Sequence, residues 1–169
     1  MHRATSSEGI IEIILSAEVQ SRWKVTPSQK ASVPPLHWLA QWRVDFGRRA
    51  DRTTVALVTN TTTLFTFVIP SKELARGQNF EQAFRLRLAD AVAPLSHFRA
   101  FLETPLVFAS GNPRMVVSSM NNMRHLLTWR LEKGKDGVKA DETWLNDTPF
   151  SSLPLSFPQE EFRSRLAER

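Results

Sequence analysis

Apolar and polar residues alternate along HWLAQWRVDF, residues 37–46, more regularly than elsewhere in the chain. One face carries Trp38, Ala40, Trp42, Val44 and Phe46, and the other carries His37, Leu39, Gln41, Arg43 and Asp45. A period of two residues is typical of a strand with one face in the core. We therefore expect a strand over 37–46 whose Trp face is covered by helices.

Two further strands are expected after this one. The turn GRRADR at 47–52 leads into TTVALVT at 53–59, and TTLFTFVI at 62–69 ends at Pro70, which cannot donate to a ladder. Asn60 and Thr61 occupy the connection, where Asn tolerates positive φ. The predicted fold class is α+β: an antiparallel β-meander over about residues 36–69, packed against several helices in a single domain spanning 1–169.

In the second half of the chain, apolar residues recur at the spacing of a helix. Residues 79–93 and 96–103 are expected helices, the second capped by Ser96. In 114–131 one helical face carries Val116, Met120, Met123, Leu127 and Leu131. A strand is the alternative there, because Val and Asn lower helix propensity.

The remaining segments carry shorter patterns. Strands are expected at 10–15 and 104–110, and a helix capped by Ser16 at 16–23. A terminal helix is expected at 157–169, with Pro158 in its first turn. The region 1–35 has the weakest pattern, and the charged, Gly-containing segment 132–143 predicts a mobile loop.

Composition narrows the function classes. The chain has no cysteine, which excludes thiol catalysis, cysteine zinc sites and disulfides. Glu12 interrupts the first apolar run, and no run reaches the roughly 20 residues that span a bilayer, so we expect a cytoplasmic protein without membrane contact. The formal charge of +5 and the pI of about 10.2 are compatible with binding to nucleic acid or another acidic partner.

Three segments follow the Trp-containing strand in a recognisable order: TNTTTLFTFVIP (59–70), SSMNNMRHLL (118–127) and LNDTPFSSLP (145–154). Together they resemble an uncharacterised bacterial family, domain of unknown function 6933, over residues 36–157. The chain departs from that family's pattern at Thr62, where Lys is expected, at Ser118, where Gly is expected, and at Phe150, where Met is expected. The resemblance implies an α+β fold and brings no activity, cofactor or catalytic residue.

The polar residues of these segments form the candidate site: Asn60, Thr63, Ser119, Asn121, Asn122, His125, Asn146 and Thr148. A His one turn after an Asn pair could serve as a base with an orienting amide, and an ordinary surface His is the alternative. Asn60 and Asn146 equally suit turns, because Asn side chains bond nearby backbone. No histidine has a partner at zinc spacing and no phosphate or nucleophile motif occurs, so we expect neither metal nor cofactor.

Two functions of different classes follow. The first is a non-enzymatic binding module, of mobile-element or defence context, that contacts a protein partner or, weakly, nucleic acid. The second is an unrecognised hydrolase or nuclease that uses the polar candidates as a pocket. For nucleic acid the candidate contacts are Arg43, Arg48, Arg49 and Arg52, with a solvated turn as the alternative.

Overall fold

Six strands form one mixed sheet in the computed structural model, which describes residues 9–93, 98–130 and 137–168. They are β1 (Ile11–Leu15), β2 (Gln29–Lys30), β3 (Gln41–Arg48), β4 (Thr54–Asn60), β5 (Thr66–Pro70) and β6 (Leu106–Ser110). Their order is β2-β6-β1-β3-β4-β5. β2, β6, β1 and β3 run parallel, whereas β3, β4 and β5 form the antiparallel half. The predicted meander is confirmed, and it continues into a parallel half.

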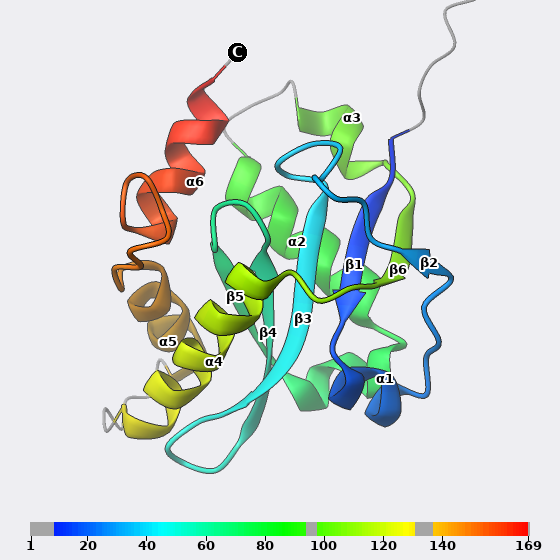
Figure 1. Cartoon of the computed structure of the whole chain (residues 1–169). Helices are drawn as coiled ribbons and strands as arrows, with labels where there is room; N and C mark the ends of the chain where they lie inside the picture. The colour runs from blue at the N-terminus through cyan, green and yellow to red at the C-terminus, as the bar shows by residue number, and fades with distance from the viewer. Residues whose placement is uncertain (1–8, 94–97, 131–136, 169) are drawn as a thin grey trace, which may run out of the picture.

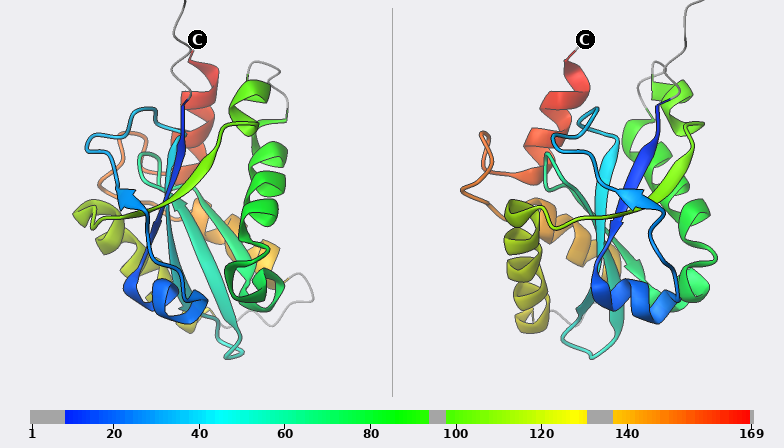
Figure 2. Two further views of the ribbon diagram at one scale, coloured as in Figure 1. Left: turned by 90° about the vertical axis from the view of Figure 1, so that its right-hand side faces the viewer. Right: turned by 45° about the vertical axis from the view of Figure 1, so that its right-hand side comes forward.

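Helices cover both faces of the sheet. They are α1 (Ala17–Trp23), the 3-10 helix η1 (Ser71–Gly77), α2 (Phe80–Val92), α3 (Arg99–Leu102), α4 (Arg114–Trp129), α5 (Gly137–Asn146) and α6 (Pro158–Ala167). In Figure 1, α2 lies behind the sheet and α4 in front of it, and the side view in Figure 2 separates the three layers. Within the described residues, no helix is long and apolar enough to cross a membrane.

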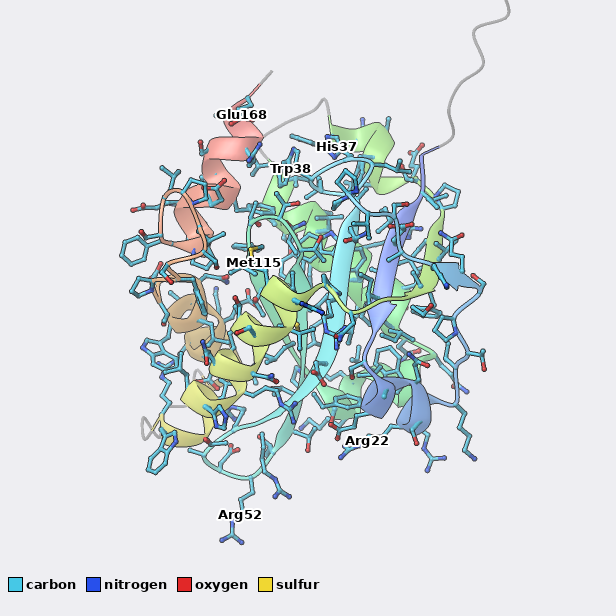
Figure 3. All side chains as sticks on the ribbon, viewed as in Figure 1. Arg22, His37, Trp38, Arg52, Met115 and Glu168 are labelled. Carbon is cyan, nitrogen blue, oxygen red and sulfur yellow. The ribbon has the colours of Figure 1, made fainter. Side chains whose placement is uncertain are left out.

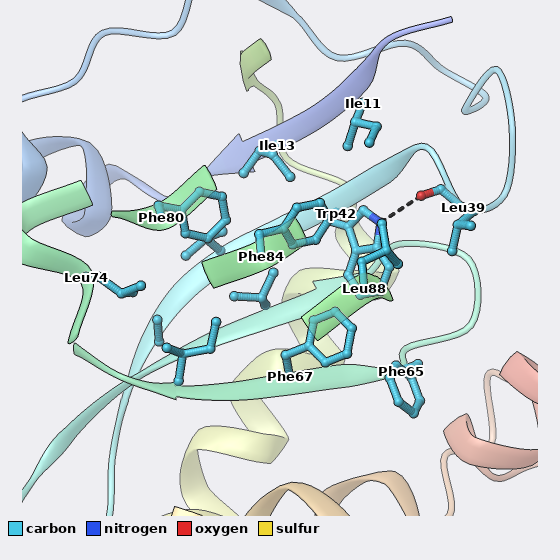
Figure 4. Close-up of a cluster of buried hydrophobic side chains, with 14 of the residues drawn as sticks. Ile11, Ile13, Leu39, Trp42, Phe65, Phe67, Leu74, Phe80, Phe84 and Leu88 are labelled. Carbon is cyan, nitrogen blue, oxygen red and sulfur yellow. Dashed lines mark hydrogen bonds between the residues drawn. The ribbon is translucent and has the colours of Figure 1, made fainter. Parts of the chain in front are cut away.

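Trp42 is the centre of the larger core, on the α2 face of the sheet. Its side chain is fully buried, stacks on Phe67 with ring centroids 5.1 Å apart, and meets Phe84 of α2 edge-on at 5.3 Å. Its indole Nε1 donates to the Leu39 carbonyl at 2.7 Å (Figure 4). The one polar atom of the ring is therefore satisfied inside the core, as burial of Trp requires. The expectation that the Trp face is core is confirmed for Trp42, Val44 and Phe46, whereas Trp38 is partly buried against the same core.

A second core fills the α4 face over the antiparallel strands. The stripe Met120, Met123 and Leu127 of α4 packs with Leu57 and Val68 of the sheet. The helical reading of 114–131 is confirmed over Arg114–Trp129, and Leu131 lies outside the described residues.

The alternating segment is a strand only from Gln41 onward. Residues 37–40 form a turn, in which the amide of Ala40 donates to the His37 carbonyl at 2.9 Å. Leu39, expected on the polar face, is fully buried as a result. The strand expected over 62–69 likewise starts at Thr66, because residues 61–65 form the connection.

The polar face of β3 does not meet solvent. Gln41, Arg43 and Asp45 are each less than 8% exposed. α4 packs across β3 on this face, and residues 111–113, which join β6 to α4, cross in front of the sheet (Figure 1). Alternation therefore predicted which residues share a face, and it did not predict that both faces are covered.

The predicted mobile loop over 132–143 is wrong for its second half, because α5 begins at Gly137. Asp141 pairs with Arg49 at 2.5 Å and with Arg130 at 3.1 Å, so its charge is used inside the fold. Residues 132–136 lie outside the described residues, as does the expected cap Ser96.

Replacing Trp42 by Ala should lower the free energy of unfolding by about 3–5 kcal/mol, because the cavity left among Phe67 and Phe84 cannot collapse fully. Urea denaturation measures the loss. Trp129→Ala is the matched control, since that side chain is 79% exposed. A loss for Trp42→Ala no larger than that of the control would contradict the assignment of the core.

Candidate functional site

A groove of about 530 Å³ lies between α4 and residues 148–152. One wall comes from Met115, Ser118, Ser119, Asn122, His125 and Leu126, and the other from Thr148, Pro149, Phe150, Ser151 and Ser152. Met115, Ser118, Asn122 and His125 are spaced by three, four and three residues, which aligns them along one side of the helix. Met115 projects at the N-terminal end of this wall (Figure 3). Four of the eight candidate residues therefore meet in one concave site.

The groove offers uncharged polar groups over a partly apolar floor. Ser118, Ser151, Ser152, Asn122 and His125 are exposed. Within the described chain, no side chain forms a hydrogen bond with the imidazole of His125, and no carboxylate lines the groove. Such a surface can donate to and accept from a ligand, and it lacks the paired acid and base of a hydrolytic site.

Asn60 is buried away from this groove and is fully bonded. Its Oδ1 accepts hydrogen bonds from the amides of Thr62 and Thr63 and from the Thr63 hydroxyl, at 2.9–3.1 Å. Its Nδ2 donates to the carbonyls of Trp38 and Gln41. Asn60 and Thr63 therefore shape the β4–β5 connection and fasten it to the turn at 37–40.

Asn146 pairs with the free edge of β5 as another strand would. Its Oδ1 accepts from the Thr66 amide at 2.8 Å, and its Nδ2 donates to the Thr66 carbonyl at 2.9 Å. One helical turn earlier, Glu142 accepts from the Val68 amide at 2.7 Å and pairs with Arg87 of α2. Burial raises the pKa of Glu142, against the opposing effects of the Val68 amide and Arg87. Two side chains of α5 thus satisfy alternate amides of the edge strand.

The remaining candidates do not join the groove as a set. Asn121 is exposed on α4 but does not line the groove. Arg43 is 6% exposed beneath the connection to α4, whereas Arg48, Arg49 and Arg52 lie on the β3–β4 hairpin. Arg49 is held by Asp51 at 2.7 Å as well as by Asp141. Arg52 projects from the hairpin into solvent (Figure 3). The four arginines therefore do not form one surface.

Glu12 anchors the polar layer on the α4 face of the sheet. Its carboxylate accepts from the Ser32 amide and hydroxyl and from the side-chain amides of Gln29 and Gln41. Burial alone would raise the pKa of Glu12, but these hydrogen bonds outweigh it and hold the pKa below its ordinary value of 4.5. Within the described residues, no group of three His, Asp or Glu side chains could hold a metal ion.

The model of one protein family, described as a domain of unknown function (DUF6933), matches residues 12–161. The chain belongs to this family. No curated protein and no solved structure matches this chain. The resemblance seen over 36–157 is therefore confirmed for a longer segment than the motifs indicated.

The three segments that carry the resemblance to DUF6933 meet in space. Residues 118–127 and 145–154 supply most of the two walls of the groove. The segment 59–70 contacts both of them, because the Thr66 amide donates to Asn146 and the Thr66 hydroxyl lies 3.4 Å from the Met123 sulfur. Segments far apart in the chain thus form one continuous region of the DUF6933 domain.

Sequence reasoning missed Met115, Ser118, Ser151 and Ser152 among the groove residues. The helical spacing of Met115 and Ser118 to Asn122 could have added the first two. The serines at 151 and 152 carried no such signal, since only tertiary packing brings their loop to α4.

Asn146→Ala should lower the free energy of unfolding by about 1–3 kcal/mol, because it leaves the buried amide and carbonyl of Thr66 unpaired. The amide of Thr66 should also exchange its hydrogen faster. Chemical denaturation and hydrogen exchange by NMR measure the two effects. Asn121→Ala, at an exposed site, serves as the control, and equal stability of the two variants would contradict the role given to Asn146.

Glu12→Gln should cost about 1–3 kcal/mol at pH 7, because a buried carboxylate that accepts several hydrogen bonds is lost. Since the folded pKa lies below the unfolded one, the carboxylate contributes its stability above pH 4.5 and loses it as pH falls through the folded pKa. The gap between wild type and Glu12→Gln should therefore shrink on acidification. Denaturation across pH 3–7 tests this, with the exposed Glu103→Gln as control; a gap independent of pH would refute it.

Proposed function

We propose that this domain is a non-enzymatic binding module that takes a segment of a partner protein into the groove between α4 and residues 148–152. The observation that carries the proposal is the gathering of Ser119, Asn122, His125 and Thr148 in one open concave site. The convergence of the three family segments around the same region supports it.

The chemistry of the groove suits an extended polypeptide. Hydroxyl, amide and imidazole groups on both walls can bond the alternating N–H and C=O groups of a peptide backbone. Met115 is 43% exposed at one end and offers an apolar contact for a side chain. Because no carboxylate, lysine or arginine lines the groove, specificity would come from shape and hydrogen bonds.

The enzymatic alternative has less support. A hydrolase of the serine or histidine type needs a nucleophile bonded to a base and a third group that orients the base. His125 has neither partner in the described chain, and Asn60, Thr63 and Asn146 are bonded within the fold.

Nucleic-acid binding is also less supported, because the arginine candidates are divided between the interior and the hairpin. A cytoplasmic location stays a prediction.

A random dodecapeptide library displayed on phage tests the proposal directly. Peptides selected on the purified protein are synthesised and titrated against wild type and against Ser118→Arg/Ser151→Arg, which places a bulky cation on each wall. The matched control is Ser21→Arg/Ser164→Arg, which adds the same charge at exposed sites elsewhere. We expect the groove variant to weaken binding at least about tenfold, since the central contacts of an interface carry most of its energy.

The control variant should bind within about twofold of wild type, as distant surface changes do. Failure to select any peptide, or equal binding by the groove variant and wild type, would contradict the proposal. Turnover of a peptide or ester by wild type that is lost in His125→Ala would instead support the enzymatic alternative.

A further inference from the structure

A second cavity, of about 400 Å³, opens beside the N-terminal end of α4 and adjoins the groove. Its walls are the loop 31–35 and the connection 111–116, and its floor contains Ile14, Gln41 and Thr61. Met115, at the start of α4, lines both the cavity and the groove (Figure 3). A ligand that lies in the groove therefore reaches the cavity by passing over one exposed side chain.

Most of the cavity wall is apolar. The apolar lining residues are Ile14, Val33, Pro35, Pro113, Met115 and Val116. Val33 is 94% exposed, although a Val side chain gains free energy when it is covered. The volume lies at the lower end of the range of ligand pockets, which suits one bulky apolar group better than a length of chain.

The polar side chains in the floor are already bonded to one another. The side-chain amide of Gln41 donates to Glu12 at 2.8 Å and to the Ser32 carbonyl at 2.9 Å. The Thr61 hydroxyl donates to the Gln41 side-chain oxygen at 3.0 Å, and the Ser32 hydroxyl donates to Glu12 at 2.8 Å. An apolar group placed over this floor leaves none of these donors without an acceptor, so its burial carries no polar penalty there.

Polar groups that remain exposed lie around this apolar centre. Asn112 and Arg114 line the cavity and are exposed, and the groove beyond Met115 is lined by hydroxyl, amide and imidazole groups. An apolar centre with a polar surround is the usual composition of a protein–protein interface. The cavity and the groove together have this composition, whereas neither has it alone.

The length of α4 sets the distance between the two parts of this surface. His125 lies ten residues after Met115, which corresponds to about 15 Å along the helix axis. An extended peptide advances about 3.3 Å per residue, so about five residues cover this distance. A residue in the cavity is therefore about five positions from the residue that lies opposite His125.

We propose that the partner segment carries one bulky apolar residue, aromatic or large aliphatic, that fills this cavity while its neighbours lie in the groove. The inference rests on the proposed function of the groove and specifies the partner. The partner has a polar stretch that bonds the groove walls and an apolar anchor about five residues from the position opposite His125. Buried anchors of this kind carry a large share of the energy of an interface.

The peptides selected on the protein test the anchor directly. We expect them to share one Trp, Phe, Leu, Ile or Met, and its replacement by Ala should weaken binding at least about tenfold. In ¹⁵N-labelled protein, the parent peptide should shift the amides of residues 31–33 and 111–112 together with those of 118–125. The Ala peptide should shift only those of 118–125. Selected peptides without a shared apolar residue, or an Ala peptide of equal affinity, overturn the inference.

A matched pair of protein variants locates the anchor. Val33→Glu should weaken the parent peptide at least about fivefold, because it places a carboxylate beside a buried apolar side chain. It should change the affinity of the Ala peptide by less than about twofold, since that peptide does not enter the cavity. Leu36→Glu, in the same loop, 75% exposed and outside the cavity lining, should bind both peptides as wild type does. An equal loss for the parent and Ala peptides in Val33→Glu would refute the placement of the anchor.

A small probe tests the cavity without any peptide. N-acetyl-L-tryptophanamide at millimolar concentration should shift the amides of 31–33 and 111–112, and N-acetyl-L-alaninamide should not. The Ser118→Arg/Ser151→Arg variant should give the same shifts, because it alters only the groove. Absence of these shifts would overturn the apolar preference of the cavity.

Failure of the anchor and failure of the groove give different results. Peptides that lose affinity for Ser118→Arg/Ser151→Arg but leave the amides of 31–33 unshifted would refute the anchor and leave the proposed function standing. Failure to select any peptide would refute the proposed function, and the anchor with it.

Discussion

Strand β3 is buried on both of its faces, and only one of these faces is apolar. Trp42, Val44 and Phe46 pack in the aromatic core, while Gln41 and Arg43 lie on the opposite face, which α4 and the connection that precedes it cover. Buried polar groups must find partners, or the fold loses the free energy of their hydration. Three residues meet this requirement on the polar face. Glu12 accepts a hydrogen bond from Gln41, and the Gly111 carbonyl accepts one from Arg43. Arg124 lies 3.7 Å from the Asp45 carboxylate and balances its charge.

This constraint also shapes the surface around α4. The connection 111–113 is tied to the sheet through Arg43, so the helix that follows starts at a fixed place relative to β3. The groove lies along one side of α4, and a cavity of about 400 Å³ lies beside its first turn. Both recesses therefore depend on how one buried polar row is covered.

The periodic elements were predictable because local sequence decides them. Alternation in β3 and the stripe Met120–Met123–Leu127 in α4 each follow from one element meeting one core. In the segment expected as a charged loop, prediction failed because charges had partners from other parts of the chain. Asp141 and Glu142 made residues 137–143 look like part of a solvated loop, yet Asp141 pairs with Arg49 and Glu142 accepts from a strand amide. No local pattern encodes such partners.

In the candidate site, too, some residues could be predicted from local sequence, and others depend on partners far away in the chain. Asn60 and Asn146 have the residue type expected for either a turn or a ligand contact, and only their bonded partners decide between the two. Ser119 and His125 were found because one helix carries them. The opposite wall, which carries Ser151 and Ser152, could not be predicted. Neither composition nor residue spacing shows that residues 148–152 lie beside α4.

The side chains of α5 along β5 have a consequence for how the molecule behaves among its own copies. An outer strand with unpaired amides is a template onto which another chain can add, and proteins avoid this by covering it. Here Glu142 and Asn146 occupy alternate positions of that template with groups that cannot extend into a further strand. The opposite border of the sheet is β2, which is only two residues long. Growth of the sheet from one molecule into the next is thereby opposed at both ends.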